Sequence, residues 1–245
     1  MEDRHGGSRR RGSGGIVSAV ATYLYCVLPH TEGLVPPPNG VGGARVRVVA
    51  GEELDLWVSD VSPEQCDASD AARAHEAVLL AALRAGRTPL PARFGCTFAS
   101  DDACVRDVTR RRESLRPLLH RVHGMMEMTV TTIVPSLPVP SLTGSPVPPA
   151  AQLQLRADTE RRTRSVLEAL RARLSRALGP VSRSEVATMR GTDPLGLRVA
   201  YLVPREMEQE FRAIVSVVAH ETATTLVVGG PLAPYDFGNV EPAGE

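Results

Sequence analysis

The chain contains 245 residues, of which 42% are hydrophobic and 23% charged, and its 28 basic residues are balanced by 28 acidic ones. This length and composition suit a globular protein with one large domain or two of ordinary size. The zero net charge excludes the strong positive field of a non-specific nucleic-acid binder, and an aromatic content of 4% argues against a base-stacking surface.

Residues 1–17 are rich in glycine, arginine and serine and predict a disordered tail. Paired arginines ahead of an apolar segment also occur in export signals. Here, however, the segment continues into an alternating pattern of Tyr23, Tyr25 and Val27 instead of ending at a cleavage site, so we favour the tail. No stretch approaches the ~20 apolar residues of a membrane span.

Three runs near the start have the composition of strands. Residues 21–28 are rich in β-branched and aromatic side chains, while residues 45–50 and 54–58 alternate apolar with polar positions. Gly51 between the last two runs predicts a hairpin.

Two helices are predicted in the same half of the chain. The first begins at Ser62, which has the spacing of a capping box with Gln65, and it ends at Gly86. The second begins at Ser100 and should kink at Pro117. Helical spacing assigns these side chains to the core: Ala71, His75, Val78, Leu79, Ala82, Leu83, Cys104, Val108, Leu115, Leu118, Leu119 and Val122.

Between these helices, residues 89–98 (PLPARFGCTF) predict another strand that carries an arginine in its middle. Phe94 and Phe98 would share one face, Arg93 would lie on the other, and Gly95 would permit close backbone approach. We expect Arg93 to form a structural ion pair or to donate hydrogen bonds to loop carbonyls at a domain junction.

The second half of the chain alternates strands and helices. The predicted elements are a strand in MMEMTVTTIV, a helix at 151–178, strands at 181–189 and 197–203, a helix at 205–221 and a strand at 224–228. The predicted inward side chains of the two helices are Val166, Leu167, Leu170, Leu174 and Leu178, then Met207, Phe211, Ile214, Val215 and Val218.

This β-α-β-β-α-β order is typical of a ferredoxin-like domain. We therefore predict an α+β fold with an N-terminal mixed α+β domain at 18–123 and a C-terminal ferredoxin-like domain at 124–238. A proline-rich loop would occupy 135–150, and residues 239–245 would be a tail.

The helix at 151–178 has an excess of arginines over acidic residues. The arginines are Arg156, Arg161, Arg162, Arg164, Arg171, Arg173 and Arg176, against Asp158, Glu160 and Glu168. Because acids are interspersed and no aromatic side chain lies among them, a solvated or protein-binding face is favoured over a nucleic-acid or membrane surface.

No catalytic or metal-binding pattern is complete. His75-Glu76 and His220-Glu221 each begin an H-E-x-x-H motif that lacks its second histidine, and there is no P-loop or G-x-S-x-G elbow. His120 and His123 lack flanking ligands, so a solvated turn is favoured over a zinc site. The four cysteines have no C-x-x-C pair and are expected to be reduced. We expect no catalytic residues, metal or cofactor.

Four short segments, read in order, resemble a known family. ATYLYCVL, PLPARFGCTF, RVAYLVPRE and GPLAPYDF are similar to the signature stretches of the gas vesicle protein GvpF/GvpL family, with AHEAVLLAAL ahead of the second. The resemblance covers residues 21–238. Cys26, Leu232 and Ala233 depart from the residues usual in the family.

The resemblance implies a non-enzymatic accessory protein of gas vesicle assembly, either cytoplasmic or a minor vesicle component. It would bind the hydrophobic shell protein and other accessory gas vesicle proteins. The alternative is a small-molecule-binding regulatory protein with a ferredoxin-like module. The motif or interface candidates are Tyr23, Tyr25, Arg93, Phe94, Gly95, Tyr201, Pro204, Arg205, Pro231, Tyr235 and Phe237.

Overall fold

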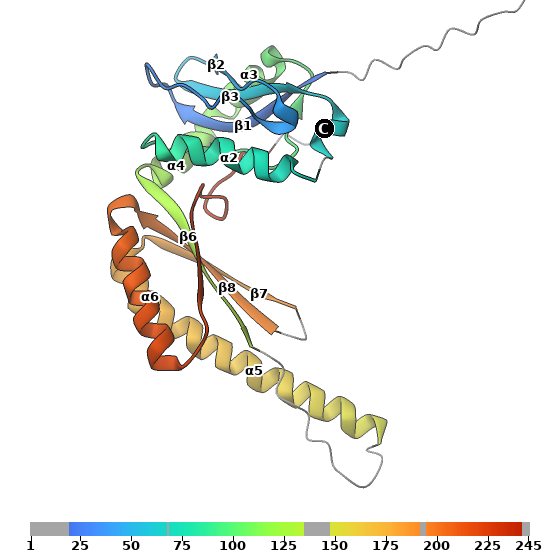
Figure 1. Ribbon diagram of the computed structural model, residues 1–245, viewed down its shortest axis with the longest axis vertical. Coiled ribbons are helices and arrows are strands. Elements are labelled where there is room, and N and C mark those ends of the chain that lie inside the picture. Colours follow the sequence, from blue (N-terminus) through green and yellow to red (C-terminus); the bar gives the residue numbers. More distant parts are fainter. Residues whose placement is uncertain (1–19, 68, 135–147, 192–194, 242–245) are drawn as a thin grey trace, which may run out of the picture.

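The computed structural model describes residues 20–67, 69–134, 148–191 and 195–241. Within these ranges the chain folds into a mixed α+β structure with two antiparallel sheets, one above the other in Figure 1. The expected N-terminal tail at 1–17, most of the expected proline-rich loop and residues 242–245 lie outside the described residues.

The first sheet is built from the N-terminal half. Its strands are β1 (Ala21–Pro29), β2 (Arg47–Ala50), β3 (Leu54–Val61), β4 (Leu90–Pro91) and β5 (Thr97–Phe98). The order is β2-β3-β1-β4, and β5 also pairs with β1. β2 and β3 pair antiparallel, which confirms the predicted hairpin.

Helices cover both faces of this sheet. They are α1 (Pro63–Cys66), α2 (Ala71–Arg84), α3 (Asp101–Arg110) and α4 (Arg112–Val122), with a 3-10 turn, η1, at Val41–Gly43. α2 packs on the face that carries Tyr23 and Trp57, whereas α3 and α4 pack on the face that carries Leu24 and Leu56. β1 is therefore buried on both sides, as its continuous apolar sequence requires.

Both predicted helices of this half are interrupted. The predicted capping box is present, since Gln65 Oε1 accepts a hydrogen bond from the Ser62 amide at 2.7 Å, but the helix stops at Cys66 and restarts at Ala71. The short polar residues between these points favour caps over helix interiors. The next helix breaks at Arg111 and not at the predicted Pro117. At the break, the Arg111 side chain binds Asp107 at 2.5 Å.

A β-bulge changes the expected alternation in β1. Leu24 pairs with Val58 and Cys26 with Trp57, so Tyr25 is the extra residue. After a bulge, the following side chains switch faces. Val27 consequently packs on the α3/α4 side, away from Tyr23 and Tyr25.

The stretch 89–98 is not one strand. It forms β4 and β5 with a turn at Phe94 and Gly95 between them. Gly95 has a φ of 82°, a left-handed conformation that favours glycine and ends regular pairing. The predicted continuous strand with two opposite faces is therefore wrong.

The second sheet comes from the other half of the chain. Its elements are β6 (Met125–Val134), α5 (Pro149–Leu178), β7 (Ser184–Arg190), β8 (Leu195–Pro204), α6 (Glu208–Thr222) and β9 (Val227–Leu232), with 3-10 turns η2 (Gly179–Val181) and η3 (Arg205–Met207). The strand order is β7-β8-β6-β9, and every pair is antiparallel. α5 and α6 contribute to the same buried cluster on one face.

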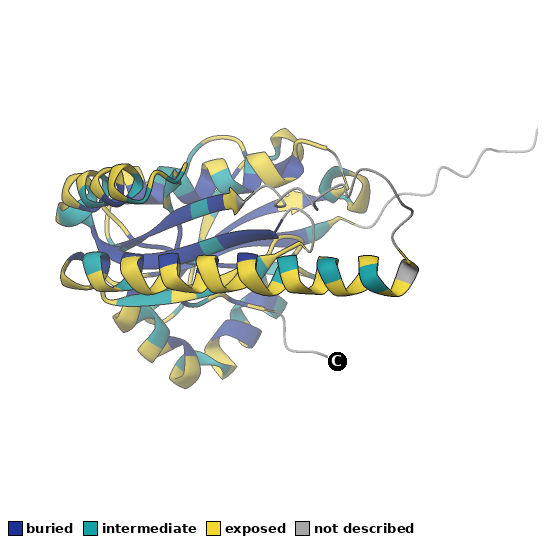
Figure 2. Cartoon of the chain, turned by 90° about the horizontal axis from the view of Figure 1, so that it is seen from below, coloured by how far each residue is buried: buried dark blue, intermediate teal, exposed yellow. Residues whose placement is uncertain are grey.

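α5 is longer than the sheet that it covers. Its 30 residues extend about 45 Å, against about 33 Å for a ten-residue strand. Its buried positions begin midway along the helix, at Thr163, and continue to its C-terminal end, whereas the N-terminal part is largely exposed (Figure 2). Leu167, Leu170, Leu174 and Leu178 face the sheet as predicted, but Val166 is 58% exposed because it lies about 100° around the helix from Leu167.

The end of the described chain returns to the first sheet. Val240, in the expected tail, is buried and pairs with Ala92, and its amide donates to the Pro91 carbonyl at 2.7 Å. Residues 239–241 are therefore part of the fold. One buried cluster also joins side chains from both halves, such as Tyr23 and Met128.

Neighbouring positions on α5 provide a test of this packing. Leu167→Ala should lower the free energy of unfolding by about 2–5 kcal/mol, because it leaves a cavity in the core. Val166→Ala should change it by less than about 0.5 kcal/mol. Urea unfolding followed by circular dichroism measures both, and equal losses would contradict the observed orientation of the helix.

Candidate functional site at the junction of the two sheets

The residues singled out from the sequence gather mainly where the two sheets meet. Tyr23, Tyr25, Phe94 and Gly95 come from the first sheet and its turn. The C-terminal segment at 233–241 reaches the junction from β9, and Arg205 follows β8 directly. Tyr201 lies instead inside the second half, where its ring packs edge-on against Phe211 at 5.4 Å.

A buried tyrosine and histidine support the turn after β4. The Tyr23 hydroxyl lies 2.8 Å from His75 Nδ1 on α2, and it accepts a hydrogen bond from the Gly95 amide at 3.1 Å. The Phe94 ring packs edge-on against both His75 and Tyr23, at centroid distances of 5.9 and 6.4 Å. Tyr23 and His75 therefore fix the turn from its buried side, while 43% of the Phe94 surface stays exposed.

Tyr25 forms a second hydrogen-bonded group beside the first. Its hydroxyl lies 2.8 Å from Ser59 Oγ and accepts a hydrogen bond from the Val41 amide at 2.8 Å. A Cβ at Gly40 would lie 2.0 Å from this hydroxyl oxygen, so the loop can approach only with glycine there. Tyr25 therefore fixes the loop before β2.

Burial keeps the central pair uncharged. It lowers the pKa of His75 to about 4, and it raises the pKa of Tyr23 well above its usual value. At neutral pH the imidazole is neutral, and the Tyr23 hydroxyl can donate to its Nδ1. Because the partner of His75 is a tyrosine held by a backbone amide, the arrangement is structural and resembles no nucleophile-base pair.

The C-terminal segment is fastened by an ionic cluster on the second sheet. Arg198 on β8 binds Glu127 Oε1 at 2.9 Å and Asp236 Oδ2 at 2.6 Å. The Asp236 amide donates to Glu127 Oε2 at 2.9 Å. Burial and the neighbouring Asp236 carboxylate raise the pKa of Glu127 above its usual value, while the Asp236 amide and the Arg198 guanidinium oppose this rise.

Aromatic side chains on either side of Asp236 complete this attachment. The centroid of the Tyr235 ring lies 6.4 Å from that of the His75 ring, and burial raises the pKa of Tyr235. Phe237 is buried against Val122 and lies 5.7 Å below the Arg121 guanidinium. The segment therefore contacts both halves.

Arg205 makes the contacts that the sequence analysis assigned to Arg93. Its guanidinium donates to the carbonyls of Leu83 and Arg87 at 2.7 and 2.5 Å and to Thr88 Oγ1 at 3.3 Å. Leu83 lies in the last turn of α2 and the other two residues follow it, so one side chain from the second half binds at a helix end in the first. Desolvation lowers the pKa of the half-buried guanidinium.

Arg93 itself lies at the surface. Its side chain is 71% exposed and lies 3.8 Å from Glu241, which is also exposed. Its amide, in contrast, donates to the Val240 carbonyl at 2.9 Å. The backbone of this residue holds the C-terminal segment, and the exposed guanidinium is accessible to other molecules beside its ion pair with Glu241.

Of the two remaining candidates, Pro204 and Pro231, only Pro231 lines a groove. Pro204 ends β8 opposite Met125. Pro231 follows a cis peptide bond in β9 and borders a groove of about 540 Å³ between α2 and the second sheet. The groove is lined by Leu80, Leu83, Arg84, Met126, Arg205, Glu208, Gly230, Pro231 and Leu232.

Within the described residues, no group of three or more His, Cys, Asp or Glu side chains is placed to hold a metal ion. The four cysteines are free, as expected. The part of the chain that the structure describes also has no helix long and apolar enough to cross a membrane.

Comparisons with known proteins agree with the resemblance. The family model "Gas vesicle synthesis protein GvpL/GvpF" matches residues 21–239. The chain is 28% identical to gas vesicle protein F of Haloferax mediterranei over 226 residues, 89% of this chain and 93% of the relative. Crystal structures of GvpF from Anabaena sp. PCC7120 and Microcystis aeruginosa have similar folds, with TM-scores of 0.76 and 0.69. Each is 20% identical and covers 90% of this chain, which spans 97% and 99% of theirs.

Replacing the two arginines separately should distinguish their roles. Arg205→Ala removes three hydrogen bonds to half-buried acceptors and should lower the free energy of unfolding by about 2–4 kcal/mol. Arg93→Ala removes only an exposed ion pair and should cost less than about 0.5 kcal/mol. Urea denaturation of both variants checks this, and an equal cost would show that Arg205 does not join the halves.

His75 should make stability depend on pH. Its folded pKa is about 4, whereas an unfolded histidine titrates near 6.5, so between these values the unfolded state binds more protons. The neutral ring's contribution is present above pH 6.5 and is lost as the pH falls toward 4, by about 2 kcal/mol between pH 7 and 5. His75→Asn should lose less stability than wild type over this interval. Parallel losses in urea denaturation would contradict a neutral His75.

Proposed function

Because this chain belongs to the gas vesicle synthesis protein GvpL/GvpF family, we propose that it is a non-enzymatic accessory protein of gas vesicle assembly. The family match across residues 21–239 is the observation that carries the proposal. The geometry supports it, because the motif residues Tyr23, Arg205 and Asp236 hold the fold together at a junction. They do not surround a reacting centre.

We also propose a division into an N-terminal α+β domain and a C-terminal ferredoxin-like domain, which meet near residue 123. The strand order β7-β8-β6-β9 and the connection of these strands through α5 and α6 support the ferredoxin-like assignment. The shared core and the return of Val240 to the first sheet imply that the two domains act as one rigid unit.

The proposed partners are the hydrophobic shell protein and other accessory gas vesicle proteins. A shell subunit that has to pack into an extended sheet exposes strand edges and apolar surface before assembly. A protein that covers this surface prevents premature aggregation. The accessory protein would act in the cytoplasm and could stay on the vesicle as a minor component.

Two surface features support a role in protein contacts. Phe94 and Arg93 stand on a turn that buried hydrogen bonds hold rigid, which lowers the entropic cost of binding. On α5, Arg156, Arg162 and Arg176 form no ion pair within the described residues, whereas Arg171 and Arg173 bind Glu185 and Glu221. The free guanidinium groups suit an acidic partner surface.

Deletion of the gene in a vesicle-forming host is the primary test. Loss of buoyant, light-scattering vesicles, restored by the wild-type gene, is the expected result. The purified protein should also retain the shell protein on an affinity column. A host that forms vesicles normally after the deletion would reject the proposed function.

The turn can be tested in the same assay. The double variant Arg93→Ala and Phe94→Ala should lose about 1–2 kcal/mol of unfolding free energy and stay folded, because Arg93 is exposed and Phe94 only partly buried against Tyr23 and His75, and it should retain less shell protein. Val35→Ala, which changes another exposed apolar side chain, is the matched control. Equal retention by all three proteins would show that the turn is not a contact surface.

A further inference from the structure

The edge strands of the two sheets differ in how they are protected against pairing with another chain. An open edge presents unpaired amide and carbonyl groups, and proteins usually block it with prolines, charges, bulges or covering segments. β2, β4 with β5, β7 and β9 form the edges of the two sheets. A comparison of these edges identifies the one that is available to a partner.

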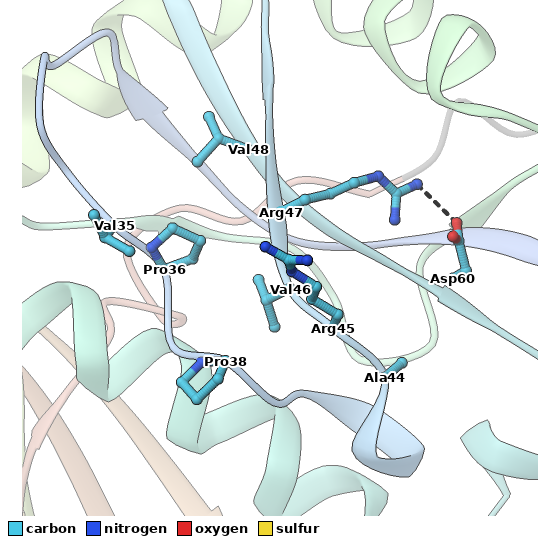
Figure 3. A pocket seen from close by; sticks show the side chains of 9 residues that line it. All are labelled: Val35, Pro36, Pro38, Ala44, Arg45, Val46, Arg47, Val48 and Asp60. Atoms are coloured by element: carbon cyan, nitrogen blue, oxygen red, sulfur yellow. Dashed lines mark hydrogen bonds and ion pairs between the residues drawn. The ribbon is translucent and has the colours of Figure 1, made fainter.

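β2 is blocked by a proline-rich loop. Figure 3 shows Val35, Pro36 and Pro38 across a cavity of about 700 Å³ from Val46 and Val48. The proline residues cannot donate to β2, and the Pro38 carbonyl already accepts the amide of Val46, the residue before the strand, at 3.3 Å. The strand also has only four residues. The loop therefore protects this edge.

Arginines add charge to the same edge. Arg45 and Arg47 flank Val46, and Figure 3 shows the Arg47 guanidinium directed toward Asp60, which it binds at 2.7 Å. Edge charges of this kind oppose the addition of a further strand.

The edges formed by β4, β5 and β9 are also closed. β4 and β5 have two residues each, and the C-terminal segment pairs beside them through Val240 and Ala92. β9 contains Gly229, Gly230 and Pro231, its pairing with β6 is irregular, and Arg212 donates to the Gly230 carbonyl at 2.7 Å. Neither edge offers a regular row of free backbone groups.

β7 lacks a proline, a bulge and a covering segment among the described residues, and its unpaired charges lie only at its two ends. Its seven residues pair with β8 in one unbroken register and include no proline or glycine. It forms the side of the sheet opposite β9, and no described residue pairs with its outer side (Figure 1). This is the type of edge that accepts an added strand.

The side chains of β7 indicate what such a strand would carry. Ala187 and Met189 pack against the core under the helices, while Val186 (36% exposed) and Thr188 lie on the other face. Arg183 lies immediately before the strand and Arg190 ends it. Both are exposed, and neither has an ion-pair partner among the described residues. A partner with a carboxylate near each end would complement them.

We propose that the outer edge of β7 binds an extended segment of a different protein as an added strand. The segment has about seven residues, alternates apolar side chains with threonine-like ones and carries an acidic residue near each end. This inference rests on the proposed function, since it assigns a binding edge to an assembly factor. Its occupant is another gas vesicle protein with such a segment.

Charge argues against a second copy of this chain as the occupant. In a symmetric dimer, two copies of β7 would pair antiparallel with the two-fold axis at Ala187, the centre of the strand. In this register the side chains of one sheet face stay on that face in both copies. The register places Arg190 opposite Ser184 of the copy, next to the copy's Arg183. Like charges at both ends destabilise the pair.

A labelled peptide provides the direct test. The probe is a fluorescein-tagged seven-residue peptide of alternating threonine and valine with aspartate at each end, and binding is followed by fluorescence anisotropy. Saturable binding to the full chain is expected. The double variant Arg183→Glu and Arg190→Glu should bind at least tenfold more weakly. Arg176→Glu, another exposed arginine without an ion pair among the described residues, should bind as the wild type does.

Adjacent proline variants test backbone pairing. Consecutive amides in a strand alternate between the neighbouring strand and the open edge, so only one of Ala187→Pro and Thr188→Pro removes an outward donor. The variant with the higher melting temperature retains its bonds to β8 and should lose peptide binding. Wild-type affinity in this variant, or no binding to the wild-type protein, would overturn the proposal.

Two further measurements separate the alternatives. A dimer in analytical ultracentrifugation that dissociates in the same proline variant would replace the foreign segment with a second copy. In the deletion host, full vesicle formation with Arg183→Glu and Arg190→Glu would reject the β7 edge and leave the accessory function standing. Normal vesicles without the gene would reject the accessory function, whatever the peptide binds.

Discussion

The structure depends on how one guanidinium, that of Arg205, joins its two halves. The side chain follows β8 and donates to the carbonyl of Leu83, in the last turn of α2, and to that of Arg87, just after the helix. A further bond between the halves lies beside it, from the Thr88 hydroxyl to the Met125 carbonyl. Because these polar groups are partly desolvated, separating the halves would leave them unpaired, at a cost of several kcal/mol.

The C-terminal segment reinforces this junction from the opposite side. Glu127 and Arg198 hold Asp236 on the second sheet, and a few residues later Val240 pairs with the first. Tyr235 lies between them against His75. The motif residues are therefore mostly occupied with one another, and recognition is left to the groups that they position: the turn of Phe94, the arginines of α5 and the edge of β7.

Local patterns in the sequence identified most elements, while long-range contacts decided the exceptions. The hairpin of β2 and β3 and the leucine ridge of α5 follow from periodicity alone. The bulge at Tyr25, in contrast, depends on Ser59 and on the loop at Gly40, which no local pattern includes. Arg111 ends a helix where it meets Asp107 and the Glu241 carbonyl, a residue 130 positions away.

The sequence by itself determined the family, the α+β composition and the order of strands and helices, because these depend on short motifs and on hydrophobic periodicity. The tertiary structure alone decided which arginine is structural and which is exposed. Neither arginine has a local pattern that identifies its partners, but only the Arg205 guanidinium lies within hydrogen-bond distance of the Leu83 and Arg87 carbonyls in the other half. The tertiary structure also decided that β7 is the open edge. Whether a strand lies at an edge depends on which other strands pair with it, and among the described residues only β8 pairs with β7.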